Sequence, residues 1–198
     1  MIEFDIVTVF HNEKNFQQQV ELSRRLARHA TKPYLLIGVD NREHNRGFAK
    51  ACNFGAQLGT APIIGFLNPD ADVAGPFMDQ VLDVFRDSRV MVTGERYGKP
   101  AREVTSWGCH DWVCGACFFV RRSWWQRLKG FDERYIWSWE ETDFIRRTQA
   151  EGGIVKSISL NIRHASPTAD TPVDSKYKQE HFGAGAKLFA TRWGRHVR

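Results

Sequence analysis

Two short acidic runs in this chain have the residue types and spacing that metal binding or proton transfer requires. Asp70 and Asp72 follow the apolar run Ile63–Leu67 and a proline, Pro69. Two carboxylates at positions i and i+2 of a turn can hold a hard divalent cation that also bridges phosphates. An ordinary turn, or the cap of a following helix, would use the same residues. This pattern alone leaves both interpretations open.

The second run, Glu140-Glu141-Thr142-Asp143, is expected near the start of a helix from about Ser138 to Glu151. Glu140 and Asp143 share a helical face at i, i+3, and Glu141 points about 100° away. Acids near a helix N-terminus are stabilised by the helix dipole, which would explain them without any function. Trp137 and Trp139 lie beside them, however. A carboxylate in an aromatic pocket acquires a raised pKa and can act as a general base.

The elements that must position these acids alternate regularly in the first half of the chain. We predict strands that are buried on both faces, because their apolar runs show little polar alternation, at Phe4–Phe10, Tyr34–Val39, Ile63–Leu67 and Val90–Thr93. Helices separate them at Glu13–Ala30, at about Arg46–Leu58 and at about Gly75–Asp87. Right-handed crossovers then predict an α/β fold with a mostly parallel central sheet and helices on both faces.

Polar residues gather where the first three strands end, at His11-Asn12, Asp40-Asn41 and Asn68–Asp72. Ligands bind at the carboxyl ends of the strands in open α/β sheets. We therefore expect a ligand site at this edge. The second half is less regular, and Cys117–Val120 is predicted there as a further buried strand.

Composition and charge restrict the classes of protein. The 198 residues suit one domain, and the net charge is +5. Residues 176–198 hold six Lys or Arg against one acid, and the preceding 175 residues are neutral overall. This excludes a uniformly basic nucleic-acid-binding surface and leaves two interpretations of the basic end. It is either a solvated tail or an anion-binding segment that uses Lys176, Lys178, Lys187, Arg192 and Arg195.

No apolar run approaches the roughly 20 residues that cross a bilayer, and four cysteines are few for this length. We therefore expect a cytoplasmic protein without a transmembrane segment. Cys114 and Cys117 have the spacing of half a zinc site, but no second pair follows at the required distance.

Taken in chain order, the motifs resemble those of the family 2 glycosyltransferases, especially the rhamnosyltransferase-like branch, which has the GT-A fold. The resemblance covers nearly the whole chain and implies a single Rossmann-like GT-A domain over 1–198. Its nucleotide-sugar-binding half would be 1–98, and its acceptor and catalytic half, with the basic C-terminal tail, 99–198. The resemblance depends on Val39–Asn41, Asn45, Gly47-Phe48, Asn53, Gly55, Phe66–Asp70, Gly115-Ala116, Val120–Arg122, Gly130–Glu133, Glu140–Asp143, His164 and Arg192–Gly194.

The resemblance implies a metal-dependent, inverting hexosyl- or deoxyhexosyl-transferase that uses a UDP- or dTDP-sugar. Glu141 stands where the family has its base aspartate, with Glu140 or Asp143 as alternatives. Mn²⁺ or Mg²⁺ would be held by Asp70, Asp72 and His164. Asn68 replaces the usual first Asp of the metal-binding motif. The donor would be bound by Asp40, Asn41, Asn45, Gly47, Asn53, Asn68 and Arg122.

The stretch Arg42–His44 after Asp40-Asn41 is shorter than is usual in the family, which weakens the expectation for recognition of the donor base. Two rival functions remain: a catalytically inactive nucleotide-sugar-binding module, and a nucleotidyltransferase with a similar sheet and metal site. The acceptor is left open between a glycan, a lipid-linked sugar, a protein and a modified nucleic-acid base. The basic tail would add a peripheral anionic contact.

Overall fold

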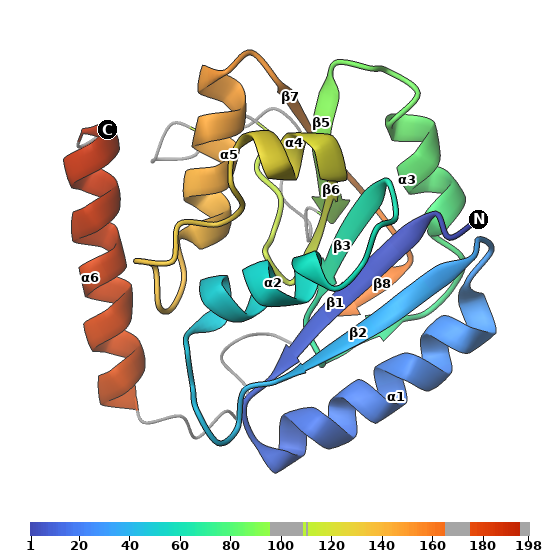
Figure 1. Ribbon diagram of the computed structural model, residues 1–198, viewed down its shortest axis with the longest axis horizontal. Helices are drawn as coiled ribbons and strands as arrows, with labels where there is room; N and C mark the ends of the chain where they lie inside the picture. The colour runs from blue at the N-terminus through green and yellow to red at the C-terminus, as the bar shows by residue number, and fades with distance from the viewer. Residues whose placement is uncertain (96–108, 110, 165–174, 195–198) are drawn as a thin grey trace.

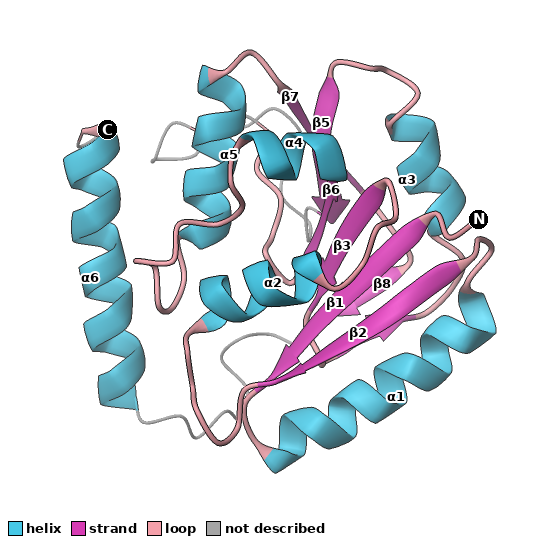
Figure 2. Ribbon diagram, viewed as in Figure 1, coloured by secondary structure: helices cyan, strands magenta, loops and turns pink. Residues whose placement is uncertain are grey.

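A six-stranded sheet with helices on both faces forms the centre of the molecule (Figures 1 and 2). The computed structural model describes residues 1–95, 109, 111–164 and 175–194. The strands are β1 Phe4–Phe10, β2 Tyr34–Asp40, β3 Ile63–Leu67, β4 Ala71–Val73, β5 Val90–Glu95, β6 Cys117–Arg121, β7 Ile154–Ile158 and β8 Ile162–His164. The helices are α1 Glu13–His29, α2 Phe48–Gln57, α3 Met78–Val84, α4 Arg122–Arg127, α5 Glu140–Ala150 and α6 Ser175–Trp193.

The order of the strands across the main sheet is β2-β1-β3-β6-β5-β7. β1 is parallel to both β2 and β3, and β5 is parallel to β7. β6 is antiparallel to both of its neighbours, β3 and β5. The predicted α/β fold with a mostly parallel sheet is therefore confirmed. One detail differs: β6 separates β3 from β5, which are consecutive in the predicted alternation of strands and helices.

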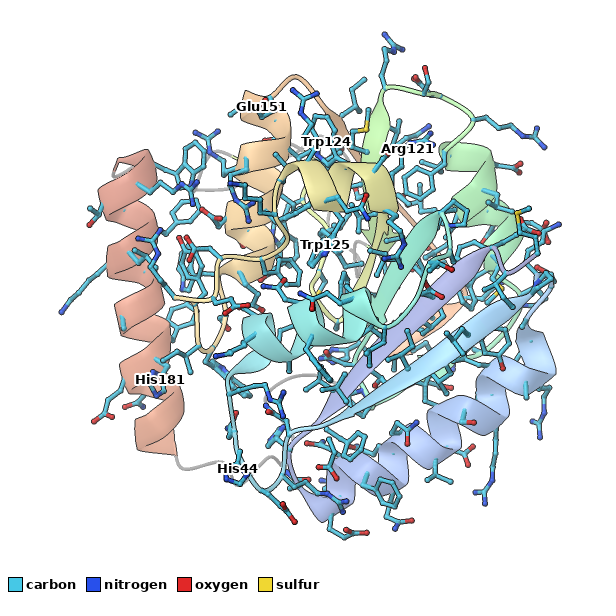
Figure 3. The ribbon with its side chains drawn as sticks, in the orientation of Figure 1. His44, Arg121, Trp124, Trp125, Glu151 and His181 are labelled. Atoms are coloured by element: carbon cyan, nitrogen blue, oxygen red, sulfur yellow. The ribbon has the colours of Figure 1, made fainter. Side chains whose placement is uncertain are left out.

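The alternation of side chains along the strands divides the core into two layers. In β6, Phe118 joins the cluster under α2, α4 and α5, whereas Phe119 joins the one under α1 and α3. Adjacent residues of a strand point to opposite faces, so a central strand is apolar at every position. Trp125 of α4, near the middle of Figure 3, packs between Phe66 and Phe144 at ring distances of 4.8 and 5.1 Å.

Three local features differ from what the sequence patterns suggested. β2 is not buried on both faces: it is an edge strand, and Leu35 is 43% exposed. The segment after Pro69 is not only a turn, because it continues into β4, which pairs with β8 in a separate two-stranded sheet. The basic C-terminal end is not a tail up to residue 193 but the helix α6. All three depend on partners distant in the sequence, which local patterns do not specify.

None of the helices in the described ranges is both long and apolar enough to cross a membrane.

Candidate functional site

Two of the three predicted metal ligands meet beside the main sheet. β4 and β8 are antiparallel, with Ala71 opposite His164. This pairing brings His164 Nε2 to 3.2 Å from Asp70 Oδ1 and to 3.4 Å from Asn68 Nδ2. Asn68 directly follows β3, so the group lies at the carboxyl end of that strand. Asn68 and His164 are 96 residues apart in the sequence, and the pairing of β4 with β8 joins them.

Asp72, the third predicted ligand, has another partner. Its carboxylate forms an ion pair with Arg25, which also pairs with Glu21 at 3.1 Å. Asp72 therefore ties β4 to α1. Within the described ranges, no three His, Cys, Asp or Glu side chains form a group that could hold a metal ion.

Asp70 and His164 nevertheless suit a cation that also binds phosphate. Mg²⁺ is usually held by one or two carboxylates together with substrate phosphates, and carboxylates also suit Mn²⁺. An imidazole nitrogen and an amide oxygen from Asn68 can complete such a set. The residues present therefore fit a divalent cation whose remaining ligands come from a diphosphate.

Four predicted donor-binding residues lie between the end of β2 and the start of α2, and three of them fold the connecting loop itself. Asn41, which is buried, donates from Nδ2 to Asn45 Oδ1 at 3.0 Å and accepts from the Arg46 amide at 3.1 Å. Asn45 Oδ1 also accepts from the Gly47 amide at 3.0 Å. Gly47 has φ +85°, which favours glycine, and its missing Cβ would lie 3.4 Å from the backbone of Ile136.

Asp40, the fourth, lies exposed at the end of β2. Arg42 forms an ion pair with it at 2.7 Å and reaches Glu13 at 2.8 Å. Hydrogen bonds from the Arg42 side chain and backbone hold the pKa of the Asp40 carboxyl below its ordinary value. Asp40 therefore presents a negative charge at the strand ends.

A small pocket opens between this loop and the segment that precedes α5. His11 and Trp137, to which the sequence assigned no specific role, face each other edge to face in its wall at 6.2 Å. Their positions were a usable signal: His11 follows β1 directly, and Trp137 precedes the acidic run. The pocket is lined by Val9, His11, Asn41, Asn45, Phe48, Ile136 and Trp137.

Two predicted donor-binding residues are used elsewhere. Asn53 of α2 is buried, donates to Phe131 O and accepts from the Phe131 amide, both at 2.9 Å, and so fixes the loop before α5. Arg122 lies at the amino ends of β1 and β3, where it pairs with buried Asp5 at 2.5 Å and donates to Ala56 O at 2.7 Å. Neither side chain lies with Asn68, Asp70 and His164 at the carboxyl ends of the strands.

Glu140 and Glu141 begin α5 as two adjacent buried carboxyls. Glu140 is 4% exposed, and Glu141 is half-buried. Burial, and next the charge of Glu141, raises the pKa of Glu140 well above its ordinary value. Burial also raises the pKa of Glu141. Within the part of the chain that is described, the Oε2 atoms of both side chains have no hydrogen-bond partner.

The two groups of polar residues meet at the short segment Gly115-Ala116. Ala116 O accepts from the Asn68 amide at 3.0 Å. A Cβ on Gly115 would lie 3.4 Å from Glu141 Cγ, which is ordinary contact distance. This segment therefore hydrogen-bonds the backbone of the residue that follows β3 and lies beside the Glu141 side chain of α5. Such a site can neutralise phosphate charge and accept a proton.

Asp143, the third candidate base, has a complete set of partners. It is fully buried and accepts from Arg147 Nε at 2.7 Å, Arg192 Nη1 at 3.2 Å and Trp193 Nε1 at 2.9 Å. Both of its oxygens accept hydrogen bonds, and the bonds from Arg192 and Trp193 join α5 to α6. Arg192, one of the candidate anion-binding residues of the basic end, takes part in this contact.

Lys187, another of the expected anion-binding residues, is exposed. The side chains of Lys176 and Lys178, and the whole of Arg195, lie outside the described residues.

The chain is similar in fold to three solved structures. It aligns with the catalytic domain of Drosophila beta1,4galactosyltransferase 7 in complex with xylobiose at a TM-score of 0.61 and 16% identity, over 91% of this chain and 80% of that one. It aligns with S. aureus TarS at a TM-score of 0.69 and 13% identity, over 96% of this chain and 39% of that one.

The third structure is TarS 1–349 in complex with UDP, with a TM-score of 0.68 and 11% identity, over 96% of this chain and 65% of that one. The chain therefore spans less than two thirds of the TarS chains. At these identities, the likeness shows the GT-A fold alone.

The sequence itself matches a family model. No curated protein sequence matches the chain significantly. The model described as "Glycosyl transferase family 2" matches residues 20–150, about two thirds of the chain. This range includes β3, the residues after it and the first turn of α5. The chain belongs to glycosyl transferase family 2.

Proposed function

We propose that this chain is a metal-dependent, inverting glycosyltransferase that moves a sugar from a nucleoside-diphosphate donor to an acceptor hydroxyl. The observation that carries the proposal is the Gly115-Ala116 segment. Ala116 of this segment accepts a hydrogen bond from the backbone amide of Asn68, whose side chain lies beside His164, and Gly115 lies next to the Glu141 side chain. A set of groups suited to the leaving diphosphate thus lies next to a buried carboxyl suited to the acceptor.

Glu141 is our proposed general base. Asp143 is committed to Arg147, Arg192 and Trp193, and Glu140 is almost completely buried, whereas Glu141 is half-buried. Its raised pKa favours uptake of the proton from the acceptor hydroxyl as that oxygen attacks the sugar. A base of this kind contributes about 10²- to 10⁴-fold to the rate.

Asp70 and His164 would hold Mn²⁺ or Mg²⁺, which supplies positive charge for the diphosphate as it leaves. Asp40 and the pocket walled by His11 and Trp137 would receive the nucleoside. The UDP complex of TarS, a structure of the same fold, supports a UDP-sugar ahead of a dTDP-sugar.

The test is calorimetric titration of the protein with UDP, with and without Mn²⁺. Asp70→Ala is expected to abolish the gain in affinity that Mn²⁺ produces. Asp72→Asn is the matched control, because Asp72 lies two residues away but pairs with Arg25. If Asp70→Ala kept the full gain in UDP affinity with Mn²⁺, this metal site would be wrong. If both variants lost that gain, Asp72 would also be a metal ligand.

The same preparation separates the rival functions. Release of UDP from UDP-glucose or UDP-N-acetylglucosamine supports sugar transfer. Release of pyrophosphate from a nucleoside triphosphate identifies a nucleotidyltransferase, and binding of UDP without turnover of any donor identifies an inactive module.

Membership of the rhamnosyltransferase-like branch, a hexosyl or deoxyhexosyl donor and a cytoplasmic location remain predictions from the sequence. The acceptor stays open between a glycan, a lipid-linked sugar, a protein and a modified nucleic-acid base.

A further inference from the structure

The turn that leads into α5 has a strained backbone immediately before the Glu140–Glu141 pair. Ser138 and Trp139 have φ values of +62° and +77°, although neither is glycine. Non-glycine residues in this conformation are strained and persist only where the surrounding structure holds them. Trp139 is also the N-cap of α5, and its carbonyl accepts from the Asp143 amide at 2.8 Å. The backbone of Trp139 therefore sets the direction of the helix start that carries Glu140 and Glu141.

The element that holds Trp139 is α6, which runs along one side of the molecule next to α5 and its leading turn (Figure 1). The indole packs against Phe182 and Phe189 at ring distances of 5.4 and 5.2 Å. Between them, buried Gly185 faces the same ring. A Cβ on Gly185 would lie 2.8 Å from Trp139 Cδ1 and 3.4 Å from Ser138 O. The helix therefore fits the turn because this position has no side chain.

A second contact joins α6 to the same helix turn. Arg192 and Trp193 donate to Asp143, three residues after Glu140. The helix thus contacts the start of α5 on both sides of the carboxyl pair, at Trp139 and at Asp143. These contacts were unexpected from a segment that looked like a basic tail.

We propose that α6 is a positioning element of the active site, in which Gly185 lets the helix clamp Trp139 in the left-handed conformation that directs Glu140 and Glu141. This inference rests on the proposed function above. Docking of α6 then controls the rate of sugar transfer and leaves binding of the nucleoside diphosphate unchanged. Trp139 and Gly185 act through the carboxyls and do not themselves touch the substrate.

Two glycines of α6 provide a matched pair of variants. Gly185→Ala places a methyl group against Trp139. Gly183→Ala adds the same methyl group two residues earlier, where no described atom lies within 4 Å. Both changes replace a helical glycine with alanine and so raise helix propensity to a similar extent. Phe182→Ala is a milder variant, because Phe182 is 51% exposed and its loss removes only a stacking contact.

The first readout is kinetic and uses UDP-glucose and UDP-N-acetylglucosamine with Mn²⁺. We expect Gly185→Ala to lower kcat for UDP release at least tenfold and Phe182→Ala to lower it less. The Kd for UDP should stay within twofold of that of the unaltered protein in both, and Gly183→Ala should match the unaltered protein. Equal kcat in Gly185→Ala and Gly183→Ala, or a parallel loss of UDP affinity, would overturn the inference.

The second readout needs no turnover. Carboxyl ¹³C NMR of glutamate-labelled protein follows the titration of the Glu140–Glu141 pair, which interact with each other, and Glu140 also with Cys52 of α2. Gly185→Ala should bring the pKa values of the pair closer to the ordinary range, because the acids lose their fixed, buried position. Identical titrations in Gly185→Ala and Gly183→Ala would reject the clamp. Failure of the proposed function would show separately, as absence of UDP release from the unaltered protein.

Discussion

The first turn of α5 contains two kinds of buried acid within four residues. Asp143 is fully buried and accepts from Arg147, Arg192 and Trp193. Glu140 and Glu141 are adjacent to each other, and their Oε2 atoms have no hydrogen-bond partner among the described residues. Residue type and helix dipole are nearly the same for all three, so only the surrounding structure distinguishes them.

This difference separates structural from chemical roles. A buried charge surrounded by donors joins parts of the fold, and here it attaches α6. A buried carboxyl that lacks such charged donors is disfavoured in its charged form and acquires a raised pKa. Strongly perturbed groups of the second kind cluster at functional sites. The comparison predicts that Glu141 controls turnover and Asp143 controls stability.

The largest expected effect is that of Glu141→Gln on turnover. The amide has nearly the same shape but cannot take a proton, so kcat for UDP release should fall by about 10²- to 10⁴-fold. The Kd for UDP and the circular dichroism spectrum should not change. If Glu141→Gln kept full activity and a folded Glu140→Gln lost it, the general base would be Glu140.

Asp143→Ala should have the largest effect on stability. Removing one partner of a buried ion pair leaves the other uncompensated, at a cost of about 3–5 kcal/mol. Because 1 kcal/mol corresponds to about 2–4 °C in a chain of this size, the melting temperature should fall by about 10 °C in scanning calorimetry. Asp83→Ala is the control, since the Asp83–Arg86 pair is exposed and should shift it by at most about 2 °C. Equal shifts in the two variants would contradict the structural role.

A smaller effect, of opposite sign, is expected for Glu140→Gln. The pKa of Glu140 is raised in the folded state, so the unfolded chain loses its proton first as the pH rises above about 4.5. Stability is lost over that range and stays lower above the folded pKa. Glutamine removes this penalty, so the melting temperature should rise by a few degrees at pH 7 and should not change at pH 4. The same shift at both pH values would indicate repacking and not proton linkage.

The smallest effects concern the basic residues of α6. Arg192→Ala should lower stability by about 1 kcal/mol, because its contact with Asp143 is partly exposed to solvent. Lys187→Ala should leave the melting temperature unchanged, since that side chain is exposed. Neither change should alter the salt dependence of UDP affinity. A weaker salt dependence of UDP affinity in Arg192→Ala would instead indicate that Arg192 contacts the phosphates.

The sequence alone specified much of the first half of the molecule. The apolar runs and helical periodicities located β1, β3, β5, α1 and α2 to within a few residues, because these patterns record burial along a short stretch of chain. The order of motifs indicated family 2, and the family model confirmed it. The polar residues after β3 and at the start of α5 were recognised from their residue types and from the elements that they follow or begin.

Tertiary structure decided what each of those residues contacts. It inserted β6 between β3 and β5, joined Asp70 to His164, and directed Asn53 and Arg122 into structural hydrogen bonds. It also turned an apparent basic tail into a helix that holds Trp139 and Asp143. The physical reason is common to all of these: a local pattern records whether a side chain is buried, whereas its partners come from segments distant in the chain, which only the packed fold brings together.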